Sequence, residues 1–291
     1  MRFRSYSPLR YPGGKTRLAD YMARLVRAQR PRPRQYAEPF AGGAGAALRL
    51  LSNEEIRIAH INDLSPGIAA FWRAMFTQTE TFAKRIETDE ISIDAWHRAK
   101  AVYSNPVAHD DLELGFATFF LNRTNRSGIL NAGPIGGLDQ RGNWKIDARF
   151  NRTDLADKVR YVGLFRNRVR LTQLDAREFL SGMSHIGSDV LVYVDPPYLV
   201  QGEHLYLDGL SYEDHAELAA LLKRTDLPWF MTYDADERIT TDLYQGLRCA
   251  SFDISHTAAT QHIGSEYAVY SDGLIVPDLE LIKGGEGRWI A

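Results

Sequence analysis

The sequence predicts an α/β protein whose mostly parallel mixed sheet is interrupted by a helical insert. Three observations predict this class. A strand, a glycine turn, a helix and a second strand follow one another within residues 35–63, which is the order of a βαβ unit. Helical patterns dominate residues 65–165, and strand patterns return from residue 169. We therefore expect one domain from residues 1–64 and 166–291, with residues 65–165 inserted into it.

The N-terminal part alternates between helix and strand. Apolar side chains recur at helical spacing in residues 16–30, and Pro31 ends that helix because proline has no N–H to donate. Residues 35–40 are a short strand candidate, followed by the turn 42–45 and a helix over 46–51. Residues 56–61 alternate with period two, which predicts a second strand.

The rest of the chain gives a helical insert and then strands again. Pro66 after Ser65 predicts a helix start, and Thr153 is expected to cap a later helix. Residues 169–172 and 190–194 predict strands, and the second is a continuous apolar run typical of a strand covered on both faces. A helix capped at Ser211, a strand over 229–233 and a hairpin of 252–256 with 267–276 complete the prediction.

Charge is distributed unevenly along the chain. The formal net charge is −2, but residues 1–34 hold ten Lys/Arg and one acid, and residues 122–170 hold eleven bases and four acids. Two basic blocks in an acidic chain indicate a polarised surface suited to nucleic acid, although two solvated helical faces would give the same pattern.

Composition excludes several classes of protein. With 44% hydrophobic and 25% charged residues among 291, the chain can build a sizeable core. Its single cysteine, Cys249, can form neither an internal disulfide nor a zinc site, so we expect no metal centre. No apolar run approaches the roughly 18 residues of a membrane helix, and residues 1–6 lack the apolar core of a signal peptide. We expect a cytoplasmic protein with no membrane partner.

The most specific motif is Asp195-Pro196-Pro197-Tyr198, directly after the buried strand. Ligands of open α/β sheets bind beyond the carboxyl ends of the strands. The Asp195 carboxylate and the Pro196 carbonyl are both acceptors and suit a group with two N–H donors, such as an exocyclic amine. Tyr198 offers a flat face on which a base could stack. The alternative is a strand stopped by two prolines, with a packed tyrosine.

The second feature is the turn from Glu38 to Gly45. Small residues let the backbone approach a ligand, and a helix N-terminus presents N–H groups to an anion. Gly42-Gly43-x-Gly45 is not the dinucleotide-binding spacing, and an ordinary tight strand–helix turn would also explain it.

Three further segments are weaker candidates. Tyr11-Pro12-Gly13-Gly14-Lys15 lacks the first glycine of a P-loop, but it places an aromatic ring and a cation before a helix. Asp63 ends the second strand, where nucleotide-binding folds commonly hold a ribose hydroxyl, and Asp175 follows the strand at 169–172 in the same way. Either aspartate could instead be a helix cap.

Taken in order, these segments resemble the D12-class DNA adenine-N6 methyltransferases, the family of the Dam methylase. The resemblance is carried by Tyr11 to Lys15, Glu38 to Gly43, Asn62-Asp63 and Asp195 to Tyr198, with cofactor motifs before the insert and the catalytic motif after it. It implies a Rossmann-like methyltransferase fold, S-adenosyl-L-methionine as cofactor and double-stranded DNA as partner. It further implies methyl transfer to the N6 amine of a flipped-out adenine, with the helical insert as the DNA-recognition domain.

The resemblance also implies roles for individual residues. The expected catalytic residues are Asp195, Pro196, Pro197 and Tyr198. The expected cofactor-binding residues are Tyr11, Lys15, Phe40, Gly42, Gly43, Gly45, Asp63, Asp175 and Asp195. The expected DNA-binding residues are Arg123, Asn125 and Arg126. Where Dam-like enzymes usually have an aromatic-Asn-Gly triplet, this chain has Arg126-Ser127-Gly128, a departure that does not support a GATC target.

Two alternatives remain open from the sequence. One is a methyltransferase of the same fold acting on RNA or on cytosine N4, although Asp195 stands where the cytosine-N4 enzymes usually have serine. The other is a catalytically silent DNA-binding homologue. A cognate restriction endonuclease is expected only as a functional partner.

Overall fold

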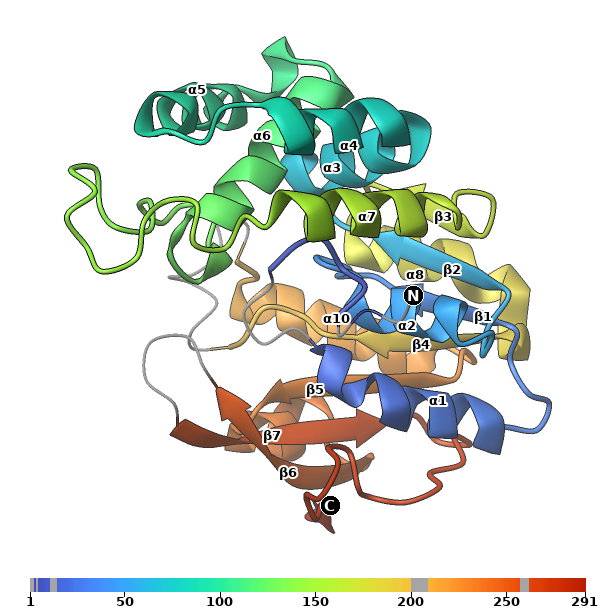
Figure 1. Ribbon diagram of the computed structural model, residues 1–291. Coiled ribbons are helices and arrows are strands. Elements are labelled where there is room, and N and C mark those ends of the chain that lie inside the picture. The colour runs from blue at the N-terminus through green and yellow to red at the C-terminus, as the bar shows by residue number, and fades with distance from the viewer. Residues whose placement is uncertain (1–2, 4, 11–14, 200–208, 257–261) are drawn as a thin grey trace. The chain divides into compact units, whose positions relative to one another are not determined.

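The computed structural model describes residues 3, 5–10, 15–199, 209–256 and 262–291. The chain divides into two compact units (Figure 1). The first unit comprises Met1–Gly14 and Leu64–Gln173, and the second comprises Lys15–Asp63 and Leu174–Ala291. In the part of the chain that is described, no helix combines the length and the apolar character needed to cross a membrane.

The second unit contains the α/β sheet. Its described strands are β1 (Gln35–Glu38), β2 (Ile58–Asn62), β4 (Val190–Val194), β5 (Trp229–Asp234), β6 (Arg248–His256), β7 (His262–Tyr270) and β8 (Arg288–Trp289). Its described helices are η1 (Lys15–Leu18), α1 (Ala19–Ala28), α2 (Gly45–Ser52), α8 (Ala176–Met183), η4 (Ser184–Asp189), α10 (Tyr212–Arg224) and η5 (Ile239–Leu243).

These strands lie in the order β2-β1-β4-β5-β7-β6-β8. The pairs β1–β2, β1–β4 and β4–β5 are parallel, whereas β7 is antiparallel to β5 and β6 is antiparallel to β7. The predicted α/β fold with a mixed, mostly parallel sheet is confirmed. Because β1, β2, β4 and β5 run in the same direction, the segments that follow them emerge at one edge of the sheet.

Helices cover both faces of this sheet, as the alternation of side chains in β4 requires. Val192 belongs to a buried cluster with Leu218 of α10 and Phe179 of α8. On the opposite face the ring of Tyr193 stacks on that of Phe230, with 5.5 Å between centroids. Tyr21 of α1 contacts Phe230 edge-on, so α1 closes this second face. Burial on both sides explains why residues 190–194 form an unbroken apolar run.

The first unit is mostly helical. Its described elements are α3 (Pro66–Thr77), α4 (Thr79–Thr88), α5 (Ile93–Ser104), η2 (Pro106–Ala108), α6 (Asp111–Thr124), η3 (Arg126–Gly128), α7 (Arg152–Gly163) and β3 (Val169–Thr172). The rings of Phe71, Phe82 and Phe119 pack together at its core. Gly115 lets α6 approach α3 closely, since a Cβ there would lie 2.7 Å from the carbonyl oxygen of Ala70.

Two local predictions were wrong. Asn151, not Thr153, caps α7, because its side chain accepts a hydrogen bond from the backbone N–H of Asp154. The second hairpin strand is His262–Tyr270 rather than 267–276, because the chain turns at Asp272-Gly273, where Gly273 has φ +31°. The capping box of Ser211 and Asp214 at the start of α10 is confirmed.

Candidate active site

Asp195 follows the last residue of β4 and is oriented by the neighbouring strand β5. The hydroxyl of Thr232 donates to Oδ1 of Asp195 at 3.0 Å, and the hydroxyl of Tyr193 lies 2.7 Å from Oγ1 of Thr232. Burial and the charge of Asp195 raise the pKa of Tyr193 well above its ordinary value, so that its phenol remains protonated. Tyr193 therefore donates to Thr232, which donates to Asp195, and this chain fixes one oxygen of the carboxylate.

Tyr198 is anchored by a different strand. Its hydroxyl donates to Oε1 of Glu266 on β7 at 2.6 Å, and Glu266 is only 1% exposed. The backbone N–H of Leu199 donates to Oδ1 of Asp234, the last residue of β5, at 3.3 Å. Burial raises the pKa of Asp234 above its ordinary value. The segment from Asp195 to Leu199 is thus held at separate points by β5 and β7, with Pro196 buried and Pro197 half-buried between them.

The turn after β1 has the backbone conformation that its small residues permit. Gly42 has φ +46° and Ala44 has φ +45°, both in the left-handed region. The backbone N–H of Gly42 donates to Oδ2 of Asp63 at 2.8 Å, which joins the turn to the end of β2. Oε1 of the buried Glu38 accepts from the backbone N–H of Ala47 in α2 at 3.1 Å. The side-chain carboxyl groups of Asp63 and Glu38 therefore fix both ends of the turn.

The remaining cofactor-binding candidates divide by position. Phe40 is half-buried in this turn, Gly43 is buried in it, and Gly45 is the first residue of α2. Lys15 begins η1, but its side chain, like the whole of Tyr11, lies outside what the structure describes. The structure thus brings the turn, Asp63 and Asp195 to one edge of the sheet.

Asn62 connects three segments at this edge. Its side-chain amide donates to the carbonyl oxygens of Pro39 at 3.0 Å and Leu174 at 2.9 Å, and its Oδ1 accepts from the N–H of Leu174 at 2.9 Å. The side chain is buried. Asn62 thereby fixes the exits of β1 and β2 and the segment that enters α8. The sequence placed Asn62 in a family motif but gave it no role.

Asp175 is a helix cap, as one of the two sequence interpretations proposed. Its Oδ1 accepts from the backbone N–H of Arg177 at 2.8 Å and caps α8. The guanidinium of Arg177 bonds to both carboxylate oxygens at 2.9 Å. This pairing is the main cause of the lowered pKa of Asp175. Both oxygens of the Asp175 carboxylate therefore accept hydrogen bonds from Arg177 of the helix that Asp175 caps.

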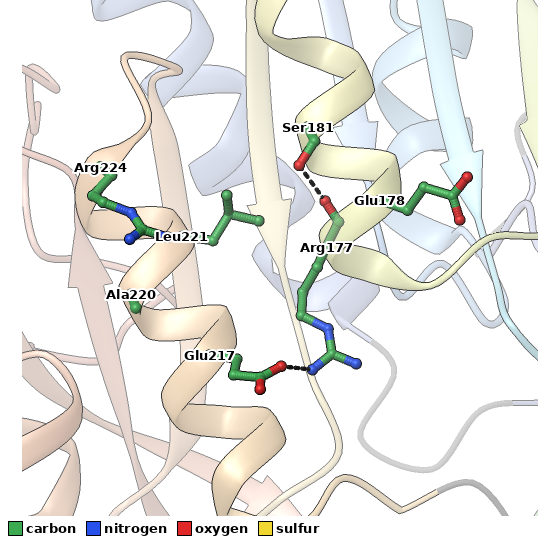
Figure 2. A pocket seen from close by; sticks show the side chains of 7 residues that line it. All are labelled: Arg177, Glu178, Ser181, Glu217, Ala220, Leu221 and Arg224. Atoms are coloured by element: carbon green, nitrogen blue, oxygen red, sulfur yellow. Dashed lines mark hydrogen bonds and ion pairs between the residues drawn. The ribbon is translucent and has the colours of Figure 1, made fainter.

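An open groove lies between α8 and α10 (Figure 2). Its described lining residues are Arg177, Glu178, Ser181, Glu217, Ala220, Leu221 and Arg224. Arg177 pairs there with Glu217, so its charge is balanced within the groove. None of these lining residues belongs to the predicted site, and the groove is separate from the Asp195 motif.

In the first unit, Asn125 does not take the place predicted for it. It is fully buried, and its Oδ1 accepts from the indole Nε1 of Trp96 at 2.6 Å. Its amide nitrogen donates to the carbonyl oxygens of Ile129 at 2.9 Å and Leu130 at 3.0 Å. The prediction that Asn125 binds DNA is corrected, because its polar atoms are used to close the loop after α6.

Three arginines gather beside this loop. We call Arg10, Arg123 and Arg149 the arginine cluster. Nε of Arg123 donates to the carbonyl oxygen of Arg149 at 3.0 Å, and Nη1 of Arg10 donates to the carbonyl oxygen of Asn125 at 3.3 Å. Burial, then the charges of Arg10 and Arg149, lower the pKa of Arg123 to about 10. An anion between these groups would relieve their repulsion. Arg126, the other predicted contact, is exposed on η3.

The position of Arg10 is fixed by Asn122 and Gly128. The backbone N–H of Arg10 donates to Oδ1 of Asn122 at 2.6 Å. The side-chain amide nitrogen of Asn122 in turn donates to the carbonyl oxygen of Arg10 at 2.7 Å. Gly128 has φ +78°, and a Cβ there would lie 2.7 Å from that carbonyl oxygen. A glycine is required at position 128, which accounts for the third residue of Arg126-Ser127-Gly128.

Comparison with known proteins identifies the family of the chain. No curated protein matches the chain. Among solved structures, the rRNA methyltransferase aviRa from Streptomyces viridochromogenes aligns over 92% of this chain and 88% of its own, at 14% identity and a TM-score of 0.38, which supports no argument about function. The family described as D12 class N6 adenine-specific DNA methyltransferase matches residues 11–263. That family implies an S-adenosylmethionine-type methyl donor and a DNA substrate. The match spans most of the chain, which therefore belongs to the D12 class of adenine-N6 DNA methyltransferases.

Proposed function

We propose that this chain is a site-specific enzyme that transfers a methyl group from S-adenosyl-L-methionine to the N6 amine of an adenine flipped out of duplex DNA. Residues 1–64 and 166–291 form the catalytic domain, and residues 65–165 form the target-recognition domain. The observation that carries the proposal is the double anchoring of the motif after β4: Thr232 orients Asp195, and Glu266 orients Tyr198.

Asp195 and Pro196 prepare the adenine amine for attack. The lone pair of that amine is delocalised into the ring, so the free base is a poor nucleophile. Acceptance of its two N–H groups by the Asp195 carboxylate and the Pro196 carbonyl favours a pyramidal nitrogen whose lone pair points outward. The base must leave the duplex to reach these acceptors, and stacking on the ring of Tyr198 offsets part of that cost.

The turn after β1 suits the cofactor. Asp63 lies at the end of β2 beside this turn and accepts from the N–H of Gly42, and a carboxylate is an acceptor that suits the two hydroxyls of a ribose. The N-cap of α2, Ala44, has no side-chain oxygen, and Glu38 accepts from the N–H of Ala47, so a cofactor carboxylate would be placed at the start of the helix, at Gly45. Phe40 offers an aromatic contact. When bound, S-adenosylmethionine supplies an electrophilic methyl group on its sulfonium.

The resemblance adds Lys15 and Tyr11 to this set, with Lys15 near the methionine carboxylate of the cofactor. The Asp175 carboxylate is not part of the proposed cofactor contacts, because Arg177 and the N-terminus of α8 occupy it. Asp175 instead caps α8, and the preceding Leu174 donates its N–H to Asn62 at the end of β2, so that the start of α8 lies beside the end of that strand.

DNA binding is assigned to the first unit. The arginine cluster and the exposed Arg126 supply guanidinium groups suited to phosphates. Alanine at both Arg123 and Arg126 is expected to weaken DNA binding and to reduce the dependence of log Kd on log salt by about one to two. An unchanged affinity and an unchanged slope would contradict the assignment.

The test of the chemistry is methyl transfer from labelled S-adenosylmethionine to unmethylated genomic DNA, RNA and protein, followed by nucleoside analysis. We expect N6-methyladenine in DNA, and sequencing that DNA would give the target site. Asp195→Ala is expected to lower the rate by about 10²–10⁴-fold with an unchanged circular dichroism spectrum. Methylated RNA or N4-methylcytosine would support the same-fold alternatives instead. Cofactor binding without transfer would support a silent homologue.

A further inference from the structure

Trp144 is exposed to an unusual degree. It lies on the loop between α6 and α7 of the first unit and is 72% exposed, more than any other described aromatic side chain. Leu138, on the same loop, is 55% exposed. Figure 1 shows this loop, in yellow-green, extending beyond the ends of the two helices. Tryptophan is normally largely buried, so such exposure points to a binding role.

Hydrogen bonds within the loop define its backbone around Trp144. The side-chain amide of Gln140 donates to the carbonyl oxygens of Ile135 at 2.8 Å and Gly137 at 2.6 Å, and its Oε1 accepts from the N–H of Ile146 at 2.8 Å. The N–H of Gly142 donates to the carbonyl oxygen of Gly136 at 3.1 Å. Gly136 has φ +88°, and a Cβ there would lie 2.6 Å from the carbonyl oxygen of Trp144. The loop backbone therefore has many internal bonds, and ordering it on binding costs little entropy.

Charge around the ring identifies the partner. The exposed stretch of the loop that carries Trp144 holds three bases and two acids, namely Arg141, Lys145, Arg149, Asp139 and Asp147. Nζ of Lys145 donates to the carbonyl oxygens of Gln140 at 2.6 Å and Gly142 at 3.2 Å, so Arg141 and Arg149 are the cations that can turn outward. The loop ends at Arg149, whose carbonyl oxygen accepts from Arg123, so it is continuous with the arginine cluster. An exposed aromatic ring on a loop that leads into the arginine cluster fits a polyanion with stacked bases better than it fits an apolar protein surface.

We propose that Trp144 contacts duplex DNA directly, with its indole stacked on, or wedged beside, a base pair while the neighbouring cations bind phosphates. The inference rests on the proposed function, because it takes duplex DNA as the substrate. It adds a base contact that supplies affinity without adding to the ionic component of binding.

The test compares Trp144→Ala and Trp144→Phe with the control Leu164→Ala, which truncates another exposed side chain of the same unit (70% exposed). The probe is a fluorescein-labelled duplex carrying the methylation site found by sequencing. We expect Trp144→Ala to raise Kd by roughly 5- to 150-fold without changing the salt slope, because base stacking is not ionic. Trp144→Phe should retain most of the affinity, and Leu164→Ala should match the unmodified protein.

Intrinsic fluorescence gives a second measurement. DNA should quench the emission of the unmodified protein and of Trp289→Phe, but the quenching should be largely lost in Trp144→Phe. Equal affinity for Trp144→Ala and the unmodified protein would overturn the inference, as would sedimentation showing that Trp144→Ala only dissociates a dimer. Failure of the unmodified protein to methylate DNA would instead refute the proposed function, so the two failures are distinguishable.

Discussion

The hydroxyl of Tyr198 donates a hydrogen bond to the buried carboxyl group of Glu266, 2.6 Å away. This bond joins the motif after β4 to the antiparallel strand β7. A tyrosine ring can rotate about two side-chain bonds, and a bond at its far end restricts both. Glu266 therefore acts as a positioning residue for the stacking face of Tyr198 rather than as a catalytic one.

Removal of this bond is expected to reduce methyl transfer. Glu266→Leu and Tyr198→Phe should each lower kcat/KM by roughly 10- to 150-fold, since a hydrogen bond to a charged group contributes about 1.5–3 kcal/mol. The double variant should lose little more than either single one, because both remove the same interaction. Glu266→Gln keeps an acceptor and should restore most of the rate. The neighbouring exposed Ser265→Ala is the control, and additive losses in the double variant would argue against positioning.

Thr232 gives a separate prediction for Asp195. Thr232→Val keeps the shape of the side chain but removes the hydroxyl that bonds to Asp195 and that accepts from Tyr193. We expect kcat to fall by roughly 5- to 20-fold and the free energy of unfolding to fall by about 1–3 kcal/mol, because the Tyr193 hydroxyl loses its buried acceptor. Thr232→Ser retains the hydroxyl and should behave like the unmodified protein in both rate and stability. A Val variant with an unchanged kcat would show that Asp195 needs no support from β5.

The sequence located the parts of the site that depend on local pattern. Asp195 to Tyr198 and Asp63 could be placed because each follows a recognisable strand, and parallel strands end at one edge of a sheet. Glu266 could not be placed, because its position opposite Asp234 depends on the pairing of β7 with β5. The available signal was a lone acid within an apolar strand, which does not name its partner.

Asn125 shows a second limit of sequence reasoning. Asparagine and arginine near one another suit the edges of bases, but the same amide also satisfies backbone groups in a loop. The choice here depends on Trp96, which lies 29 residues earlier in the chain and donates to Asn125. Burying an asparagine costs little when its side chain makes three hydrogen bonds, as Asn125 does, so the residue type alone does not separate a base contact from a loop-closing role.

Asn62 is expected to be a stability determinant of the site. Asn62→Ala would leave the carbonyl oxygen of Pro39 and both backbone groups of Leu174 without this partner. We expect the free energy of unfolding to fall by about 2–4 kcal/mol, as measured by urea denaturation. Asn167→Ala, at an exposed position, is the matched control and should change it by less than about 0.5 kcal/mol. A loss at Asn62 no larger than that of the control would show that the three segments hold together without it.

Glu38 gives a prediction about pH. Burial raises the pKa of Glu38 to about 8 from an ordinary value of 4.5. Between these values the folded protein retains a proton that the unfolded chain releases, so stability must fall as pH rises from about 4.5 to 8. In Glu38→Gln the amide oxygen can still accept from the N–H of Ala47, but nothing ionises. The free energy of unfolding of the unmodified protein, relative to that of Glu38→Gln, should therefore decline by roughly a few kcal/mol between pH 5 and pH 9.

Urea denaturation at pH 5, 7 and 9 measures this decline, with the exposed Glu178→Gln as control. The control should follow the unmodified protein at every pH, because Glu178 is exposed and lies outside the turn. The charge that forms on Glu38 at high pH also repels Asp195, whose charge contributes to the raised pKa. Cofactor affinity should consequently fall with rising pH in the unmodified protein and fall less in Glu38→Gln, because the turn held by Glu38 and Ala47 is the one proposed to bind the cofactor. Parallel stability curves for the unmodified protein and Glu38→Gln would mean that Glu38 ionises without cost in the folded state.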